Sequence, residues 1–121
     1  MLKSTNYRES LLYYQDEGKG SPVILLHGFG ESGSIWSEQI IFLSDYFRII
    51  TPDLPGSGSS RMPEAVDQFL TMEDYADALN MILERENIPV CTLIGHSMGG
   101  YITLAFAAKF PEKLNGFGLF H

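Results

Sequence analysis

The chain carries little positive charge and almost no cysteine. Its 121 residues include 8 Lys and Arg against 15 Asp and Glu, which gives a net charge of −7. A nucleic-acid partner needs basic side chains to neutralise phosphates, so we expect none. The single cysteine, Cys91, falls inside an apolar run, which predicts a buried, reduced thiol and no disulfide.

Long hydrophobic runs are also missing. No apolar stretch approaches the roughly 18 residues that span a membrane, and the segment Met1–Asn6 lacks the apolar core of a signal peptide. We therefore expect a soluble, cytoplasmic protein with no membrane partner. The sequence has no internal repeat, low-complexity tract or linker, which indicates one domain or part of one.

Short apolar runs alternate with helical patterns along the chain. Such alternation favours an α/β fold with a mostly parallel sheet flanked by helices and right-handed crossovers, entered through an antiparallel N-terminal strand. Helices are expected from an N-cap at Ser34, from a capping box at Thr71 and over residues 101–108. A long loop is expected over residues 52–70, and strands over residues 10–15, 23–26, 47–51, 90–94 and 114–120.

The segment Gly95–Gly100 has the sequence Gly-His-Ser-Met-Gly-Gly and lies between a predicted strand and a predicted helix. A Gly-x-Ser-x-Gly turn in that setting is a nucleophile elbow, in which a strained backbone lifts the serine hydroxyl above the sheet. The following helix N-terminus favours negative charge on the group that the serine attacks. The pattern therefore predicts Ser97 as a catalytic nucleophile.

The glycine-rich loop before it allows two interpretations. Gly28, Gly30 and Gly33 match Gly-x-Gly-x-x-Gly after a strand, and Asp53 follows twenty residues later, which is the spacing of a dinucleotide-binding half-domain. Against this, Glu31 would place a carboxylate beside a pyrophosphate. The second interpretation makes the loop part of an oxyanion hole, with backbone N–H donors at Phe29 and Met98.

Three segments together carry a family resemblance. His27–Gly30 with Trp36 after it, Asp53–Ser60 and Gly95–Gly100 stand in the order and approximate spacing of the α/β-hydrolase superfamily. The chain resembles the N-terminal half of that fold, in the branch of serine esterases and thioesterases, over nearly its whole length. The serine at position 97 matters, because dehalogenases and epoxide hydrolases of the superfamily carry aspartate there.

The resemblance implies a serine hydrolase that acts on an ester, thioester or related small acyl substrate through an acyl-enzyme at Ser97, without cofactor or metal. It assigns the oxyanion hole to the N–H groups of Phe29 and Met98, and substrate contacts to these two residues and Gly28. We expect His27 to brace the oxyanion loop, and in the family the loop over residues 53–60 is mainly structural. The family's catalytic acid and histidine follow later strands.

The chain ends at His121, after its presumed sixth strand. We therefore expect residues 1–121 to be a partial hydrolase core, without the cap and C-terminal part, and inactive alone. A C-terminal segment or second chain would supply the acid and histidine, while His121 could line the pocket or replace the missing base. Two alternatives remain open, a non-catalytic binding scaffold of the same fold and the dinucleotide-binding half-domain.

Overall fold

The sheet is built from strands of five to eight residues in an α/β arrangement. The structure is a computed structural model that describes residues 1–61 and 70–120. Its helices are α1 (Ser37–Leu43), α2 (Met72–Arg85) and α3 (Met98–Lys109), with short 3₁₀ helices at Gly33–Trp36 and Pro111–Lys113. Its strands are β1 (Leu2–Tyr7), β2 (Ser10–Glu17), β3 (Pro22–Leu26), β4 (Arg48–Pro52), β5 (Cys91–His96) and β6 (Leu114–Phe120).

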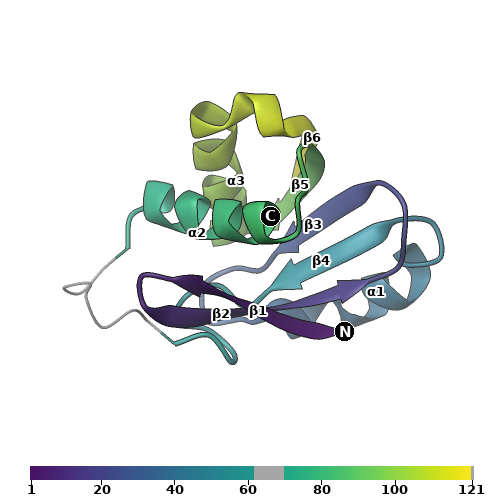
Figure 1. Ribbon diagram of the computed structural model, residues 1–121, viewed down its shortest axis with the longest axis horizontal. Helices are drawn as coiled ribbons and strands as arrows, with labels where there is room; N and C mark the ends of the chain where they lie inside the picture. Colours follow the sequence, from purple (N-terminus) through teal and green to yellow (C-terminus); the bar gives the residue numbers. More distant parts are fainter. Residues whose placement is uncertain (62–69, 121) are drawn as a thin grey trace.

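The six strands form one sheet in the order β1-β2-β4-β3-β5-β6 (Figure 1). Strands β4, β3, β5 and β6 run parallel, whereas β2 pairs antiparallel with both β1 and β4. The crossovers between parallel strands contain helices, as the alternating sequence pattern requires. This confirms the predicted α/β fold with an antiparallel entry.

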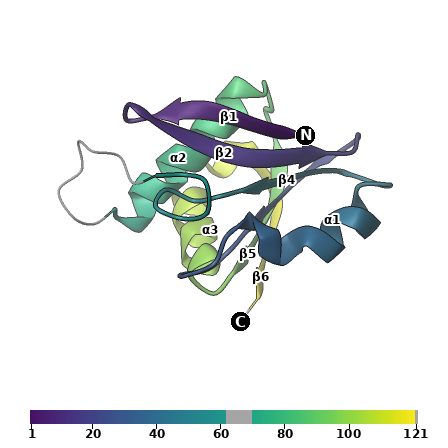
Figure 2. The same cartoon turned by 90° about the horizontal axis from the view of Figure 1, so that it is seen from below.

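Helices cover both faces of the sheet. Figure 2 shows α1 on one side and α2 with α3 on the other. The larger core lies under α2 and α3, where Leu79, Leu83 and Phe106 are fully buried against alternate residues of the central strands. The smaller core lies under α1 and contains Leu25 and Trp36. Both cores bury apolar surface, the main favourable contribution to folding.

Helix α2 follows the sequence pattern closely. The Thr71 hydroxyl accepts from the N–H of Asp74, and the Asp74 carboxylate accepts from the N–H of Thr71. This reciprocal pair is the predicted capping box and satisfies two N–H groups at the helix start. The apolar residues Ala78, Leu79, Ile82 and Leu83 recur at helical spacing, so they lie on one face of α2 and are buried.

The region after β3 differs from its prediction. Ser32, not Ser34, caps the 3₁₀ helix Gly33–Trp36, and α1 begins only after it, at Ser37, without a side-chain cap. Ile41, an apolar residue of α1, is 76% exposed. A change from 3₁₀ to α geometry alters the residues per turn, so one helical period cannot describe this segment.

The N-terminal strand β1 was not predicted. Its residues Lys3–Asn6 are all polar, so they lack the alternation that indicates a strand. The strand forms because it pairs antiparallel with β2 through the tight turn at Arg8 and Glu9, both of which have positive φ. Strand β1 lies at the edge of the sheet, and its hydrogen bonds to β2 hold it in the extended conformation.

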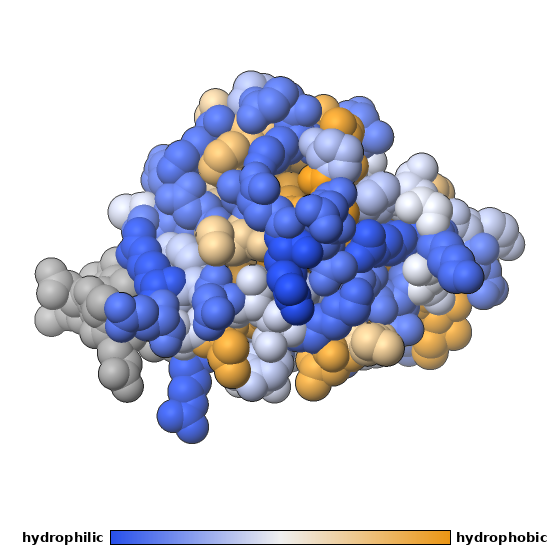
Figure 3. All heavy atoms as spheres, in the orientation of Figure 1, coloured by the Kyte–Doolittle hydropathy of each residue, from blue (hydrophilic) through white to orange (hydrophobic). Residues whose placement is uncertain are grey.

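The surface seen in Figure 3 is mostly hydrophilic, with separate apolar patches, one of them over α1. Among the residues that the structure describes, no helix is both long and apolar enough to cross a membrane. Cys91 is a buried free thiol, as expected, and burial raises its pKa to about 11.

Candidate active site

Ser97 lies at the apex of a sharp turn between β5 and α3. It has φ 57° and ψ −118°, a left-handed conformation that costs a non-glycine residue roughly 1–3 kcal/mol. Its N–H donates to the carbonyl of Phe120 at 3.0 Å, which ties the turn to the end of β6. The Gly100 N–H donates to the Ser97 carbonyl at 2.8 Å and closes the first turn of α3.

Two glycines leave room for this turn. A Cβ atom added at Gly95 would lie 2.1 Å from the carbonyl oxygen of Gly99. A Cβ atom at Gly99 would lie 2.7 Å from the carbonyl oxygen of His27. The strand, the helix and the end of β3 therefore approach each other more closely than any side chain would permit. The strand, tight turn and helix therefore have the geometry that the Gly-x-Ser-x-Gly pattern predicted.

The loop after β3 packs against the elbow. A Cβ atom at Gly28 would lie 2.9 Å from the Cβ of Ser97, so the loop backbone touches the residue that carries the hydroxyl. Among the described residues, no backbone carbonyl accepts a hydrogen bond from the N–H of Phe29 or Met98. The structure thus brings Gly28 and Ser97 together and leaves these two N–H groups available.

His27 is a buried brace of this loop. Its side chain is 0% exposed, its Nδ1 lies 2.8 Å from the Gly28 carbonyl oxygen, and its Nε2 lies 3.0 Å from the Leu54 nitrogen. The Leu54 N–H must donate to Nε2, so Nδ1 carries the proton. Burial lowers the pKa of His27, which favours this neutral form. Both ring nitrogens are occupied, so His27 is not available as a base.

The sequence did not predict the contacts of Glu31. Its Oε1 accepts from the Gly28 N–H at 2.7 Å and lies 3.0 Å from Nδ1 of His96. From the sequence alone, this carboxylate counted only against pyrophosphate binding. No local signal could have found the contact with His96, because the two residues are 65 positions apart and meet only through the pairing of β3 with β5.

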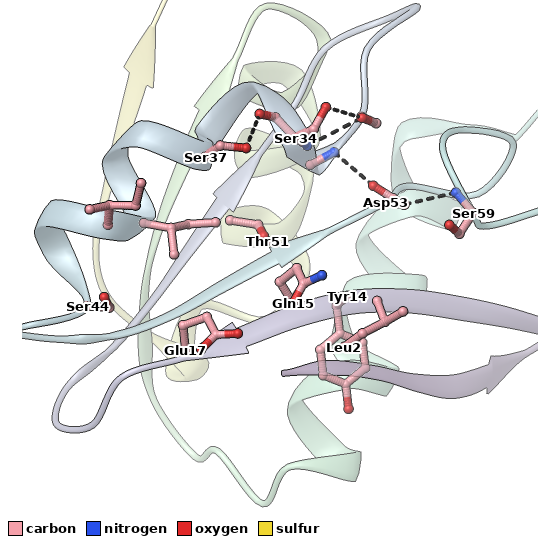
Figure 4. A pocket seen from close by; sticks show the side chains of 14 residues that line it. Leu2, Tyr14, Gln15, Glu17, Ser34, Ser37, Ser44, Thr51, Asp53 and Ser59 are labelled. Carbon is pink, nitrogen blue, oxygen red and sulfur yellow. Dashed lines mark hydrogen bonds between the residues drawn. The ribbon is translucent and has the colours of Figure 1, made fainter.

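Asp53 holds two loops together on the α1 side of the sheet. Its Oδ1 accepts from the Gly33 N–H at 2.8 Å, and its Oδ2 accepts from the Ser59 N–H at 2.9 Å (Figure 4). These bonds occupy the carboxylate that a ribose would require. The Gly33 N–H is taken too, and a 3₁₀ turn replaces the helix N-terminus that binds a pyrophosphate. The structure therefore counts against the dinucleotide alternative.

Besides a hollow of about 530 Å³ that Glu31 and His96 help to line, two further hollows adjoin the elbow within the described residues. One of about 440 Å³ is lined by Ser97 together with the mostly apolar residues Gly100, Tyr101, Leu104, Leu119 and Phe120. The other, of about 370 Å³, is lined by the loop after β3, the loop after β4, Tyr75 and Met98. Phe29 lies at this second hollow and is 87% exposed. Space for a small ligand therefore exists beside Ser97 and beside Met98.

Some predicted features are not placed. His121 and residues 62–69 of the predicted loop lie outside the described residues. The remaining histidines, His27 and His96, each have Nδ1 engaged by a neighbour. Within residues 1–61 and 70–120, no group of three or more His, Cys, Asp or Glu side chains could hold a metal ion.

Comparison with known proteins identifies the family. The model of the alpha/beta hydrolase fold family matches residues 21–119, which include the glycine-rich loop after β3, residues 53–60 and the turn at Ser97. The fold, with its antiparallel entry and its strained serine between β5 and α3, is of the same class. The chain belongs to the α/β-hydrolase family.

The relatives include enzymes of several kinds. A hydrolase of (E)-2-((N-methylformamido)methylene)succinate from Acinetobacter baylyi is 32% identical over 111 residues, which are 92% of this chain and 40% of that protein. The solved structure of a thermophilic esterase from Thermogutta terrifontis is 37% identical with a TM-score of 0.87, over 98% of this chain and 43% of that one. The N-acyl homoserine lactonase AidH is 29% identical with a TM-score of 0.91. The chain thus spans less than half the length of these proteins.

Proposed function

We propose that the chain is the nucleophile-bearing portion of a serine hydrolase for ester, thioester or related acyl substrates. The observation that carries the proposal is the strained backbone of Ser97 on an elbow that permits no side chain at Gly95. Strain of this kind persists only where the surrounding structure enforces it and is concentrated at functional sites. The esterase and lactonase relatives support an acyl substrate.

In the proposed reaction, the Oγ of Ser97 attacks the substrate carbonyl carbon and gives up its proton to a base. The carbonyl oxygen becomes an oxyanion, which the N–H groups of Phe29 and Met98 stabilise; loss of one such donor costs other enzymes about 3–4 kcal/mol. The leaving group departs with a proton and leaves an acyl group on Ser97. Water then attacks the acyl carbon, releases the acid and restores the hydroxyl.

Within residues 1–61 and 70–120, no hydrogen bond links the Ser97 hydroxyl to a histidine. Both ring nitrogens of His27 are bonded to backbone groups, and the Nδ1 of His96 faces Glu31. A serine hydroxyl without an adjacent base is a weak nucleophile. We therefore propose that a further segment of the protein or a second chain supplies a histidine and an acid, and that residues 1–121 alone do not turn over esters efficiently.

Labelling with a fluorophosphonate tests the nucleophile. The longest natural form of the protein that contains residues 1–121 should gain one phosphonyl group, which peptide mass spectrometry places on Ser97. Ser97→Ala should abolish the label. Ser57→Ala is a matched control, because Ser57 lines the neighbouring hollow without belonging to the elbow, and it should be labelled normally. Labelling that persists in Ser97→Ala would overturn the proposal.

A binding scaffold without catalysis is the second candidate. The observation in its favour is that, among the described residues, no histidine forms a hydrogen bond with the Ser97 hydroxyl. A binding scaffold predicts that Ser97 stays unlabelled even in the longest natural form. The 121-residue chain should in either case hydrolyse p-nitrophenyl acetate no faster than its Ser97→Ala variant, because no described histidine is bonded to Ser97 and an unassisted serine hydroxyl is a weak nucleophile.

A further inference from the structure

One carboxylate oxygen joins the two loops of the proposed site. The Oε1 of Glu31 accepts from the Gly28 N–H in the loop after β3, at 2.7 Å. The same atom lies 3.0 Å from Nδ1 of His96, the last residue of β5 and the neighbour of Ser97. Glu31 therefore connects the loop that carries Phe29 with the strand end that carries the nucleophile.

Glu31 is ionised at neutral pH. The hydrogen bond from the Gly28 N–H holds the pKa of its carboxyl below the usual value, and the His96 ring acts in the same direction, while burial opposes both. A carboxylate close to an oxyanion hole repels the negative charge that develops there. If Glu31 serves the site, its contribution must therefore come from the contacts that its side chain makes and not from its charge.

The contacts of Glu31 fix the position of Gly28 next to Ser97. The backbone of Gly28 already touches Ser97, since an added Cβ would lie 2.9 Å from the Ser97 Cβ and 3.1 Å from the His96 carbonyl oxygen. The Glu31 N–H also donates to the Gly28 carbonyl at 3.2 Å, so the loop folds back on itself as a tight turn. In this turn Gly28 is fixed at its N–H by the Glu31 side chain, and Phe29 follows directly with its N–H available.

Oxyanion donors act only over a narrow range of about 2.7–3.1 Å from the oxygen. His27 and Asp53 tie this loop to the loop after β4, but among the described residues only the Glu31 side chain bonds it to the strand that precedes Ser97. Supporting contacts must hold a site within about 0.5 Å. The Glu31 contact with His96 spans the two elements directly. It is therefore placed to fix the separation between one oxyanion donor and the nucleophile.

We propose that Glu31 is a positioning residue that, with His96, holds the oxyanion loop against the nucleophile elbow. This inference rests on the proposed function of Ser97 and Phe29. The hydrogen bond from the Gly28 N–H is the essential contact. The contact with His96 orients the Glu31 carboxylate so that it can accept this bond. The charge of Glu31 is not required, because an amide oxygen can accept the same N–H.

Glu31→Gln and Glu31→Ala separate these contributions in the longest natural form of the protein. Two quantities are measured, the hydrogen exchange rate of the Gly28 amide by NMR and the rate constant for phosphonylation of Ser97. Because loss of one oxyanion donor costs about 10²–10³ in rate, displacement of that donor in Glu31→Ala should slow phosphonylation by about 10–100-fold. Exchange at Gly28 should rise, and the thermal unfolding midpoint should change little.

Glu31→Gln should stay within about threefold of the parent in both measurements, because its amide oxygen keeps the Gly28 bond. Glu38→Ala is the matched control, an exposed glutamate on α1 that should leave both rates unchanged. If Glu31→Ala does not fold, the same two quantities are measured in His96→Ala. In that variant phosphonylation of Ser97 should slow and exchange at Gly28 should rise, both by less than expected for Glu31→Ala.

The two proposals fail in different ways. A parent protein that is never labelled at Ser97 overturns the proposed function, and the Gly28 amide then still reports whether Glu31 holds the loop. Unchanged Gly28 exchange in Glu31→Ala overturns the positioning role, whatever the reactivity of Ser97. Phosphonylation of Glu31→Ala at the parent rate, or equal losses in Glu31→Gln and Glu31→Ala, would also overturn it.

Discussion

Gly95 and Gly99 are in direct backbone contact, and a Cβ atom at Gly95 would lie 2.1 Å from the Gly99 carbonyl oxygen. Real Cβ atoms do not approach a fixed oxygen so closely, so Gly95→Ala must displace β5 from α3. We expect the free energy of unfolding to fall by at least the roughly 1–3 kcal/mol of an overpacked core. Urea denaturation measures this change, and phosphonylation of Ser97 should slow in the same variant.

Gly116→Ala is the control for this prediction. Gly116 is also a strand glycine, in β6, but a Cβ atom there would meet nothing within 4 Å. Its replacement should change stability by no more than about 0.5 kcal/mol. Equal stabilities of the two variants would show that the close approach of β5 and α3 is not required.

The buried His27 makes stability depend on pH. Its pKa is lowered in the folded protein by burial, so the unfolded chain binds the proton more readily. Stability is therefore fully present above the ordinary histidine pKa of about 6.5 and is lost as the pH falls below it. The slope contributed by one group is at most about 1.4 kcal/mol per pH unit.

His27→Gln should remove this dependence. Urea denaturation at pH 7 and at pH 5 should show a smaller loss of stability on acidification in His27→Gln than in the parent, although the variant is less stable at pH 7. A parent whose stability is the same at both pH values would contradict a neutral buried His27.

Arg48 holds a cluster of charges where β1, β2, β4 and α2 meet. Its Nε and Nη2 donate to the two carboxylate oxygens of Asp16 at 3.0 and 2.7 Å, and Nη2 also reaches Glu86 at 2.7 Å. The Tyr14 hydroxyl donates to Glu86 as well. Arg48→Met leaves two carboxylates with Lys3 as their remaining cation, so we expect a loss of about 3 kcal/mol.

Lys109→Met is the matched comparison, because its partner Asp77 and its own side chain are both exposed by more than a third. Loss of this surface pair should cost no more than about 1 kcal/mol. Chemical denaturation of both variants at one pH tests the difference. Equal losses would mean that burial does not strengthen the Arg48 cluster.

Asp53 should matter for folding and not for ligand binding. Asp53→Ala leaves the Gly33 and Ser59 N–H groups without their acceptor, and each unpaired N–H that remains buried costs about 1–3 kcal/mol. Asp53→Asn keeps one acceptor oxygen and should lose less. Titration of the parent with a nicotinamide or flavin dinucleotide should give no saturable binding. Saturable binding abolished by Asp53→Asn would restore the dinucleotide alternative.

The sequence determined the fold class and the elbow because both depend on local patterns. The apolar run of β5, the glycines around Ser97 and the capping box at Thr71 each act within a few residues. Chain-order alternation then allowed few sheet topologies. The same reasoning failed at β1, whose polar residues form a strand only through pairing with β2, and around Ser34, where helix geometry changes after four residues.

The tertiary structure alone decided how the candidate site is held together. Spacing in the sequence could not distinguish a phosphate loop from an oxyanion loop, because the same three glycines fit both. The structure counts against the phosphate loop because the Gly33 N–H is bonded to the side chain of Asp53, twenty residues further along the chain. The contact of Glu31 with His96 has the same origin. Hydrogen bonds between loops depend on where the sheet brings strand ends together, and no local pattern of residues records that position.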